Sequence, residues 1–360
     1  MRTQRVKFSI DGNLMWIFVS LILGSLLCIN SMSLAAEDAW IAKADMPTAR
    51  LILSSCTVDG KIYTIGGGSD ANTVLSVVEE YDPVADIWTK KANMPTARYA
   101  LSTSAVDGKI YAIGGLRLHH GPAYSTVEEY DPKTDTWTRK ADMPTPRGMF
   151  TTSVVNGKIY AIGGAQSTAG PALSTVEEYD PATDTWEKKA NMPEARYYHS
   201  AGVVNDRIYI LAGAPRERVA DPSVFEYDPA TDTWEEKADA PTSRCWSSAS
   251  TVDGKIYVMG GITGDINNII SMVEEYDPLT DTWTRKADMP AKRSTLSTSA
   301  VDGKIYAIGG LEVNFWGISA VDEYNPGFAP PPDKIPDEIP EARPVLPQGK
   351  LPTTWGKIRG

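Results

Sequence analysis

The sequence predicts an all-β protein, and three observations support that prediction. First, the sequence repeats itself, because a Gly-Gly pair or its equivalent recurs every 48 or 49 residues. Second, each repeat contains short runs such as KIYAIGG and TVEEY, in which residue types that favour strands alternate. Third, the 360 residues include 29 Gly, 25 Pro, 16 Tyr and 10 Trp, a composition that suits many short strands joined by tight turns.

The first element is an apolar segment, residues 1–36, which has the three parts of an export signal. Basic residues precede an apolar run over residues 14–27, and small residues at Ser33 and Ala35 suit cleavage immediately afterwards. The alternative is an uncleaved membrane anchor, because residues 12–36 carry no charge and are long enough to span a bilayer. We expect export, to the periplasm, the medium or the cell surface, and membrane contact only if the segment is retained.

Six repeats fill residues 37–326 and begin near residues 50, 98, 147, 196, 244 and 293. They share an Arg series and a Trp series. The arginines are Arg50, Arg98, Arg147, Arg196, Arg244 and Arg293, and the tryptophans are Trp40, Trp88, Trp137, Trp186, Trp234 and Trp283. A residue present in every repeat usually serves the repeat itself. We therefore expect structural roles for both series, with the arginines capping carbonyls or stacking on Trp.

Each repeat is expected to form four short strands. Asp-Gly or Asn-Gly before Lys predicts the hairpin between the first two strands, because Gly accepts the positive φ of a tight turn. The motif Y-D-P-x-T-D-T-W joins the last two, where Pro fixes φ and Asp side chains accept hydrogen bonds from nearby amides. One four-stranded sheet cannot bury both of its faces. The sheets are therefore expected to stack around an axis as a six-bladed β-propeller with four-stranded antiparallel blades.

The two ends of the repeat array predict how the ring closes. The last repeat has Arg293 and Tyr324 but lacks a Trp strand, whereas Ala39-Trp40-Ile41 stands before the first Arg. An N-terminal strand that completes the last blade would remove the exposed sheet edges. We expect this closure.

The combination of Gly-Gly, then Tyr-Asp, then Trp at a period near fifty resembles the kelch motif. The resemblance extends over about four-fifths of the chain. It implies that the first strand of each blade lines the central channel and that the fourth strand lies outermost. Galactose oxidase resembles this chain in its blades.

One face of this propeller is expected to bind a ligand. The loops between strands two and three differ in every repeat, whereas the opposite face consists of near-identical VDGK and YDPxTDTW turns. Binding residues tend to lie on variable loops held by a rigid scaffold. The chain is therefore predicted to be a binding scaffold whose ligand is a protein or a carbohydrate.

The candidate ligand-binding residues gather around the first strands and loops of this face. Aromatic and hydrogen-bonding groups in repeats four and five are expected at the channel rim, and Arg forks can hold an anionic or polar ligand. The alternative is that the rings pack the channel and that the arginines pair with Glu217 or Asp221. The candidates are Tyr197, Tyr198, His199, Trp246, Arg216, Arg218, His119, His120, Phe315 and Trp316.

Charge and composition exclude several other functions. The net charge of −11 argues against a nucleic-acid partner, which needs clustered Lys and Arg. Three histidines and no suitable Cys or acidic spacing predict no metal site and no cofactor. Cys56 and Cys245 lie at different repeat positions, so two buried free thiols are expected rather than a disulfide.

Two enzyme families with kelch blades are similar to this sequence. Galactose oxidase needs a copper site with two His and Tyr ligands, which cannot be mapped here. The bacterial N-acetylneuraminate epimerase, a mutarotase, is an exported six-bladed kelch protein, and mutarotation needs only a positioned acid–base pair and a carboxylate-binding Arg. Arg216, Glu217 and Arg218 supply those residue types. A sugar-modifying enzyme is thus the alternative to a non-catalytic binder.

The last element, residues 327–360, carries a proline every few residues and has no strand alternation. This composition predicts an extended, disordered tail. Its end, LPTTWGKIRG, regains Trp and Ile and is interpreted as a short terminal tag.

Overall fold

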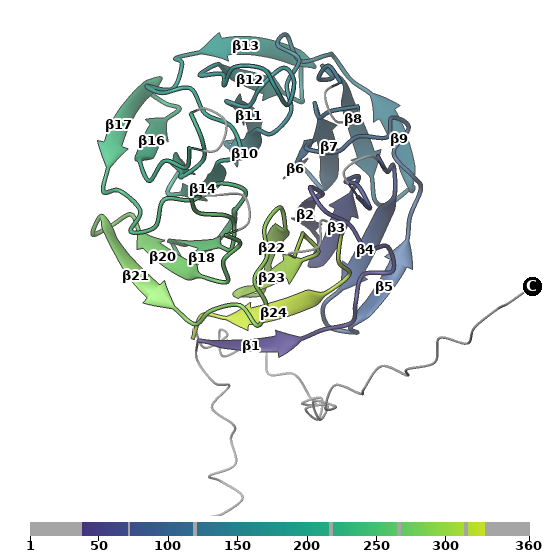
Figure 1. The fold of residues 1–360 in the computed structure, drawn as a ribbon. Coiled ribbons are helices and arrows are strands. Elements are labelled where there is room, and N and C mark those ends of the chain that lie inside the picture. Colours follow the sequence, from purple (N-terminus) through teal and green to yellow (C-terminus); the bar gives the residue numbers. More distant parts are fainter. Residues whose placement is uncertain are drawn as a thin grey trace, which may run out of the picture. The chain divides into compact units, whose positions relative to one another are not determined.

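The computed structural model describes residues 38–70, 73–117, 121–215, 219–264, 268–312 and 316–327. In these ranges it contains 24 strands in six four-stranded antiparallel sheets, arranged as blades around a central axis (Figure 1). The predicted all-β six-bladed propeller is therefore confirmed. The expected signal or anchor and the Pro-rich tail lie outside the described residues. Within the described ranges, no helix has the length and apolar character needed to cross a membrane.

The first three blades follow the chain order, and each runs from the channel outwards (Figure 1). Blade 1 contains β2 (Ser54–Val58), β3 (Lys61–Ile65), β4 (Val78–Asp82) and β5 (Ile87–Lys90). Blade 2 contains β6 (Ser102–Val106), β7 (Lys109–Ile113), β8 (Val127–Asp131) and β9 (Thr136–Arg139). Blade 3 contains β10 (Thr151–Val155), β11 (Lys158–Ile162), β12 (Val176–Asp180) and β13 (Thr185–Lys189).

The last three blades complete the ring. Blade 4 contains β14 (Ser200–Val204), β15 (Arg207–Leu211), β16 (Val224–Asp228) and β17 (Thr233–Lys237). Blade 5 contains β18 (Ser248–Val252), β19 (Lys255–Met259), β20 (Val273–Asp277) and β21 (Thr282–Lys286). Blade 6 combines β22 (Ser297–Val301), β23 (Lys304–Ile308) and β24 (Val321–Asn325) with the N-terminal strand β1 (Ala39–Ala42), as the sequence predicted.

The closing strand β1 is held by side chains as well as by its ladder. Trp40 lies opposite Tyr324 in the register, and its indole Nε1 donates to the Ala287 carbonyl at 3.1 Å. The Asp38 carboxylate accepts hydrogen bonds from the Tyr324 hydroxyl at 2.5 Å and from the Ala287 amide at 2.8 Å. Blade 6 is thus tied both to itself and to the linker that leaves blade 5.

Two turn types shape the face that carries the near-identical VDGK and YDPxTDTW turns. In blade 2, Asp107 and Gly108 both have positive φ, 50° and 72°, as a tight two-residue hairpin requires. In the second turn, the Asp131 carboxylate accepts the Lys133 amide at 2.9 Å. The Asp135 carboxylate accepts the Tyr130 hydroxyl at 2.6 Å and the amide of Ala92, in the linker from blade 1, at 2.8 Å.

The hydrophobic core lies between blades rather than within them. Between blades 1 and 2, for example, Tyr63 and Ile65 pack with Leu101, Ile110 and Tyr130. Five further clusters repeat this packing around the ring. Because a sheet must cover both faces with neighbours, closure of the ring buries every blade on both sides.

The two cysteines of the described chain are free thiols. Cys245 is buried, as expected, but Cys56 is only partly buried, and it packs against the core cluster between blades 1 and 2. Burial raises the pKa of the Cys245 thiol to about 12, which makes it a poor nucleophile.

Candidate functional site at the channel mouth

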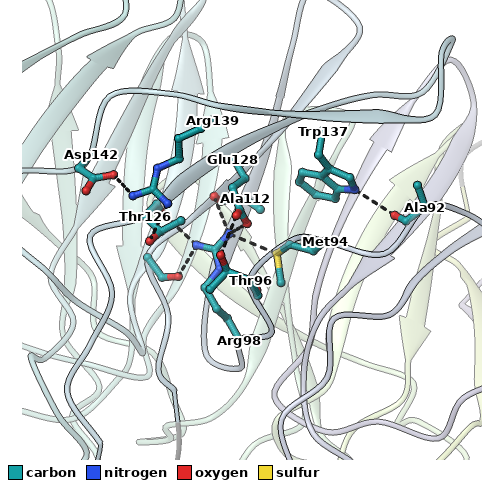
Figure 2. A network of polar contacts seen from close by, with 11 residues as sticks. Ala92, Met94, Thr96, Arg98, Ala112, Thr126, Glu128, Trp137, Arg139 and Asp142 are labelled. Carbon is teal, nitrogen blue, oxygen red and sulfur yellow. Dashed lines mark hydrogen bonds and ion pairs between the residues drawn. The ribbon is translucent and has the colours of Figure 1, made fainter.

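The variable loops are anchored by buried arginines. Arg98 is fully buried and donates to the carbonyls of Gly114 and Thr126, at 2.7 and 2.8 Å, where the loop between β7 and β8 begins and ends (Figure 2). Its guanidinium also pairs with the buried Glu128 carboxylate at 2.8 Å, and Glu128 accepts the Thr96 hydroxyl at 2.7 Å. The arginines thus cap carbonyls, and a carboxylate completes the clamp.

Equivalent clamps occur around the ring, with one exception. The partners of the equivalent arginines are Glu79, Glu177, Glu274 and Asp322. In blade 4 the carboxylate is replaced by Phe225, and the Arg196 guanidinium lies over that ring at 4.8 Å. Arg196 instead contacts Glu194 at 3.2 Å and Asp221 at 3.7 Å, both of which are more exposed. Blade 4 therefore departs from the clamp pattern of the other five blades.

A closed ring of backbone hydrogen bonds surrounds the channel mouth. Six residues, each two positions after a clamp arginine, donate their N–H to the carbonyl of the equivalent residue in the neighbouring blade, at 2.9 to 3.1 Å. All six have positive φ, between 51° and 59°. They are Ile52, Ala100, Met149, Tyr198, Trp246 and Thr295. This conformation is rare for a β-branched residue, so Ile52 and Thr295 hold strain that the ring must offset.

A cavity of about 210 Å³ opens inside this ring. Each blade contributes four consecutive residues to its wall, beginning with the ring residue and continuing into the innermost strand. Within this lining there is no Asp, Glu, Lys or Arg. Ser and Thr hydroxyls bridge every pair of neighbouring blades except one, where the bridge joins Thr151 to the His199 imidazole at 3.0 Å.

Blades 4 and 5 make one side of the cavity different from the rest. Tyr198 and Trp246 stand edge to face, with ring centroids 4.9 Å apart. Below them, His199 and Ser247 occupy the position that is apolar in the other four blades, where the residues are Leu53, Leu101, Phe150 and Leu296. Burial, followed by the nearby Arg196 charge, lowers the pKa of His199 to about 3, so the imidazole is neutral at neutral pH.

The structure separates the sequence-predicted residues into three groups. Tyr198, His199 and Trp246 line the cavity, although His199 is buried in its wall rather than exposed at the rim. Tyr197 is buried behind the ring, against the loop 168–172 and Pro215. Trp316 is 64% exposed on the blade 6 loop and does not line the cavity. The remaining candidates, Arg216, Arg218, His119, His120 and Phe315, lie outside the described residues.

Sequence reasoning missed Thr295, Ser247 and the belt of hydroxyls. Their signal was present, because STSA and similar runs follow every clamp arginine, but Ser and Thr in a strand also read as ordinary solvent-facing residues. Among the described residues, no group of three or more His, Cys, Asp or Glu side chains is placed to hold a metal ion.

Comparison with known proteins agrees with this architecture. Residues 22–213 and 187–310 match the family described as the KLHDC2/KLHL20/DRC7 Kelch-repeats domain. The chain belongs to the kelch-repeat family. No curated protein matches it. A solved structure titled "Structure of YjhT" superimposes with a TM-score of 0.68 at 17% identity, over 77% of this chain and 95% of that one. At this identity the likeness shows the fold.

Proposed function

We propose that this kelch propeller is an exported, non-catalytic binding scaffold, which takes a protein or carbohydrate ligand on the face with the variable loops. One observation carries the proposal. In a molecule whose blades otherwise repeat closely, the side chains around the channel mouth differ from blade to blade, and they surround a cavity. Loops and rims on a rigid scaffold are where binding residues concentrate.

The charge of the cavity supports binding rather than catalysis. Mutarotation of an acidic sugar requires an acid–base pair and a cation for the carboxylate. The described cavity lining contains no Asp, Glu, Lys or Arg, and its imidazole, His199, is held neutral. Arg216, Glu217 and Arg218, which suggested this enzyme class, lie outside the described residues. Incubating the protein with sialic acid anomers and following their exchange by NMR tests the enzyme directly, and we expect no acceleration.

The binding face is tested with paired double variants. Full-length protein is immobilised and exposed to a glycan array and to an extract of exported proteins. We expect Y198A/W246A to abolish specific capture. The matched control, V84A/L279A, removes two apolar side chains that are 89% and 90% exposed on the repeated-turn face, and it should capture as the parent does. Equal capture by the parent and Y198A/W246A, or its loss in the control alone, would contradict the proposed face.

Export is tested separately. Cell fractionation should recover the protein outside the cytoplasm, and its intact mass should lack residues 1–35. A mass that retains them would favour the anchor.

A further inference from the structure

We infer that the cavity at the channel mouth binds a single neutral sugar ring, seated between the Tyr198–Trp246 pair and the hydroxyl-lined wall that includes Thr295 of neighbouring blade 6. The inference rests on the proposed function, since it names the ligand class of the same face. It differs from the anionic ligand that Arg216 and Arg218 first suggested. Four properties of the described cavity lead to it: charge, size, unused hydrogen-bonding capacity and asymmetry.

The charge of the wall favours a neutral ligand. An anion or cation entering the cavity would lose its hydration without meeting an opposite charge, because the lining holds no Asp, Glu, Lys or Arg. The buried arginines beneath the ring are already paired with carboxylates or carbonyls. A ligand that carries many hydroxyls and no charge avoids this cost, because each hydroxyl can both donate and accept.

The size of the cavity favours one ring. Its volume of about 210 Å³ is below the range of roughly 300 to 1,000 Å³ that is typical of pockets for drug-sized ligands. A disaccharide or a folded peptide loop would have to extend beyond the mouth. A single six-membered ring with its hydroxyls fits the enclosed part, while a longer glycan chain would leave through the open end.

Unused hydrogen-bonding capacity marks where the ligand would be held. Thr295 lines the cavity and is only 7% exposed, and its hydroxyl oxygen, which is buried, has no hydrogen-bond partner among the described residues. A buried hydroxyl without a partner is costly, and such atoms often await a ligand or water. His199 adds a second group in the same wall, since its buried Nδ1 has no hydrogen-bond partner among the described residues.

The uneven distribution of aromatic residues around the cavity indicates where the apolar face of the ligand would pack. Tyr198 and Trp246 are the only aromatic rings at the six ring positions, and both are partly exposed to the cavity. A sugar ring presents C–H groups on one face, which pack against aromatic faces, and hydroxyls around its edge. The aromatic pair on blades 4 and 5 and the Thr295 hydroxyl on neighbouring blade 6 match these two surfaces.

The experiment compares neutral sugars with the corresponding uronic acids. Full-length protein is titrated with the methyl glycosides of glucose, galactose and mannose, and with the corresponding methyl uronides, by calorimetry and saturation-transfer NMR. At least one neutral glycoside should bind at millimolar concentration or below, and its uronide should bind at least about tenfold more weakly because the carboxylate meets no cation. Absence of binding by all neutral glycosides, or stronger binding of the uronides, would overturn the inference.

Single variants then test where in the cavity the sugar binds. W246A should weaken binding of the neutral glycoside about tenfold or more, whereas W316A removes an exposed Trp from the same face outside the cavity and should leave it unchanged. T295V should weaken binding about tenfold, with an unchanged or higher melting temperature, because it removes a hydroxyl that has no partner. Equal losses of affinity for the glycoside in W246A and W316A would contradict the proposed position of the sugar.

The two proposals fail separately. If no neutral sugar binds but Y198A/W246A still abolishes capture of a protein, the sugar inference is wrong and the binding face stands. If neither sugar binding nor protein capture responds to the mouth variants, both are wrong.

Discussion

At the scale of single residues, the clamp arginines are the most completely buried charged side chains among the described residues. Arg98 gives up its hydration completely, and burial lowers its pKa to about 10, although the Glu128 charge opposes that shift. A buried guanidinium is tolerated only when its donors and its charge are both satisfied. The clamp therefore fixes the ends of the variable loop firmly, but only while its carboxylate is present.

We expect E128Q to lower the free energy of unfolding by about 3 kcal/mol, because it leaves the Arg98 charge buried without a counter-charge. D142N is the matched control, since it breaks the half-exposed Arg139–Asp142 pair in the same blade and should cost at most about 0.5 kcal/mol. Urea denaturation of both variants measures the difference. Equal costs would show that burial of the clamp pair does not matter.

The Tyr–Asp pairs predict that the stability of the folded protein depends on pH. The hydrogen bond from the Tyr130 hydroxyl holds the pKa of Asp135 below its usual value of 3.8. A carboxylate with a lowered folded-state pKa contributes stability that is present above pH 3.8 and is lost as pH falls through the folded-state value. Y130F should therefore lose less stability than the parent between neutral pH and strong acid. Denaturation curves across this range test it, and parallel pH profiles would contradict it.

At the scale of strands and turns, each blade uses positive φ at several points for different reasons. Gly108 closes a hairpin in open space, whereas a Cβ on Gly114 would lie 2.5 Å from the Arg147 carbonyl and 2.9 Å from the Phe150 ring. The Gly-Gly motif is therefore a close contact between blades, and blade 4, where Ala212 takes this place with φ of 58°, holds strain.

The two glycines of blade 2 should respond differently to alanine. G108A introduces only the cost of positive φ, about 1 kcal/mol. G114A adds a clash with a neighbouring backbone and should cost about 3 kcal/mol or more. Chemical denaturation compares them. A G114A protein as stable as G108A would mean that the blades separate easily at this contact.

At the scale of the whole molecule, the hydrogen-bond ring, the belt of hydroxyls and the cavity all depend on closure of the propeller. The ring of backbone hydrogen bonds at the mouth and the belt of hydroxyls below it both run through all six blades. Neither can form if one blade is displaced. The cavity is therefore a product of the closed ring and belongs to no single repeat.

Deletion of residues 37–43 should abolish the monomeric folded state, because it removes β1 and leaves β24 as an open edge. Light scattering after size-exclusion chromatography, together with thermal melting, measures the effect. A deletion of the same length at the C-terminus, residues 354–360, controls for chain shortening and should leave both measurements unchanged. A protein without β1 that stays monomeric and melts at the parental temperature would contradict the role of closure.

The sequence by itself determined the repeat number, the strands, the turns and the closing strand, because period, alternation and turn chemistry are local properties of the chain. It also placed Tyr198 and Trp246 at the mouth, since they follow a repeated Arg. Only the tertiary structure decided that Arg98 meets Glu128, 30 positions away, that His199 is buried and neutral, and that Thr295 faces the same cavity. The Arg98–Glu128 pair depends on how segments distant in sequence come together within one blade, and the other two relations depend on how the blades pack around the ring. No local pattern in the sequence records either arrangement.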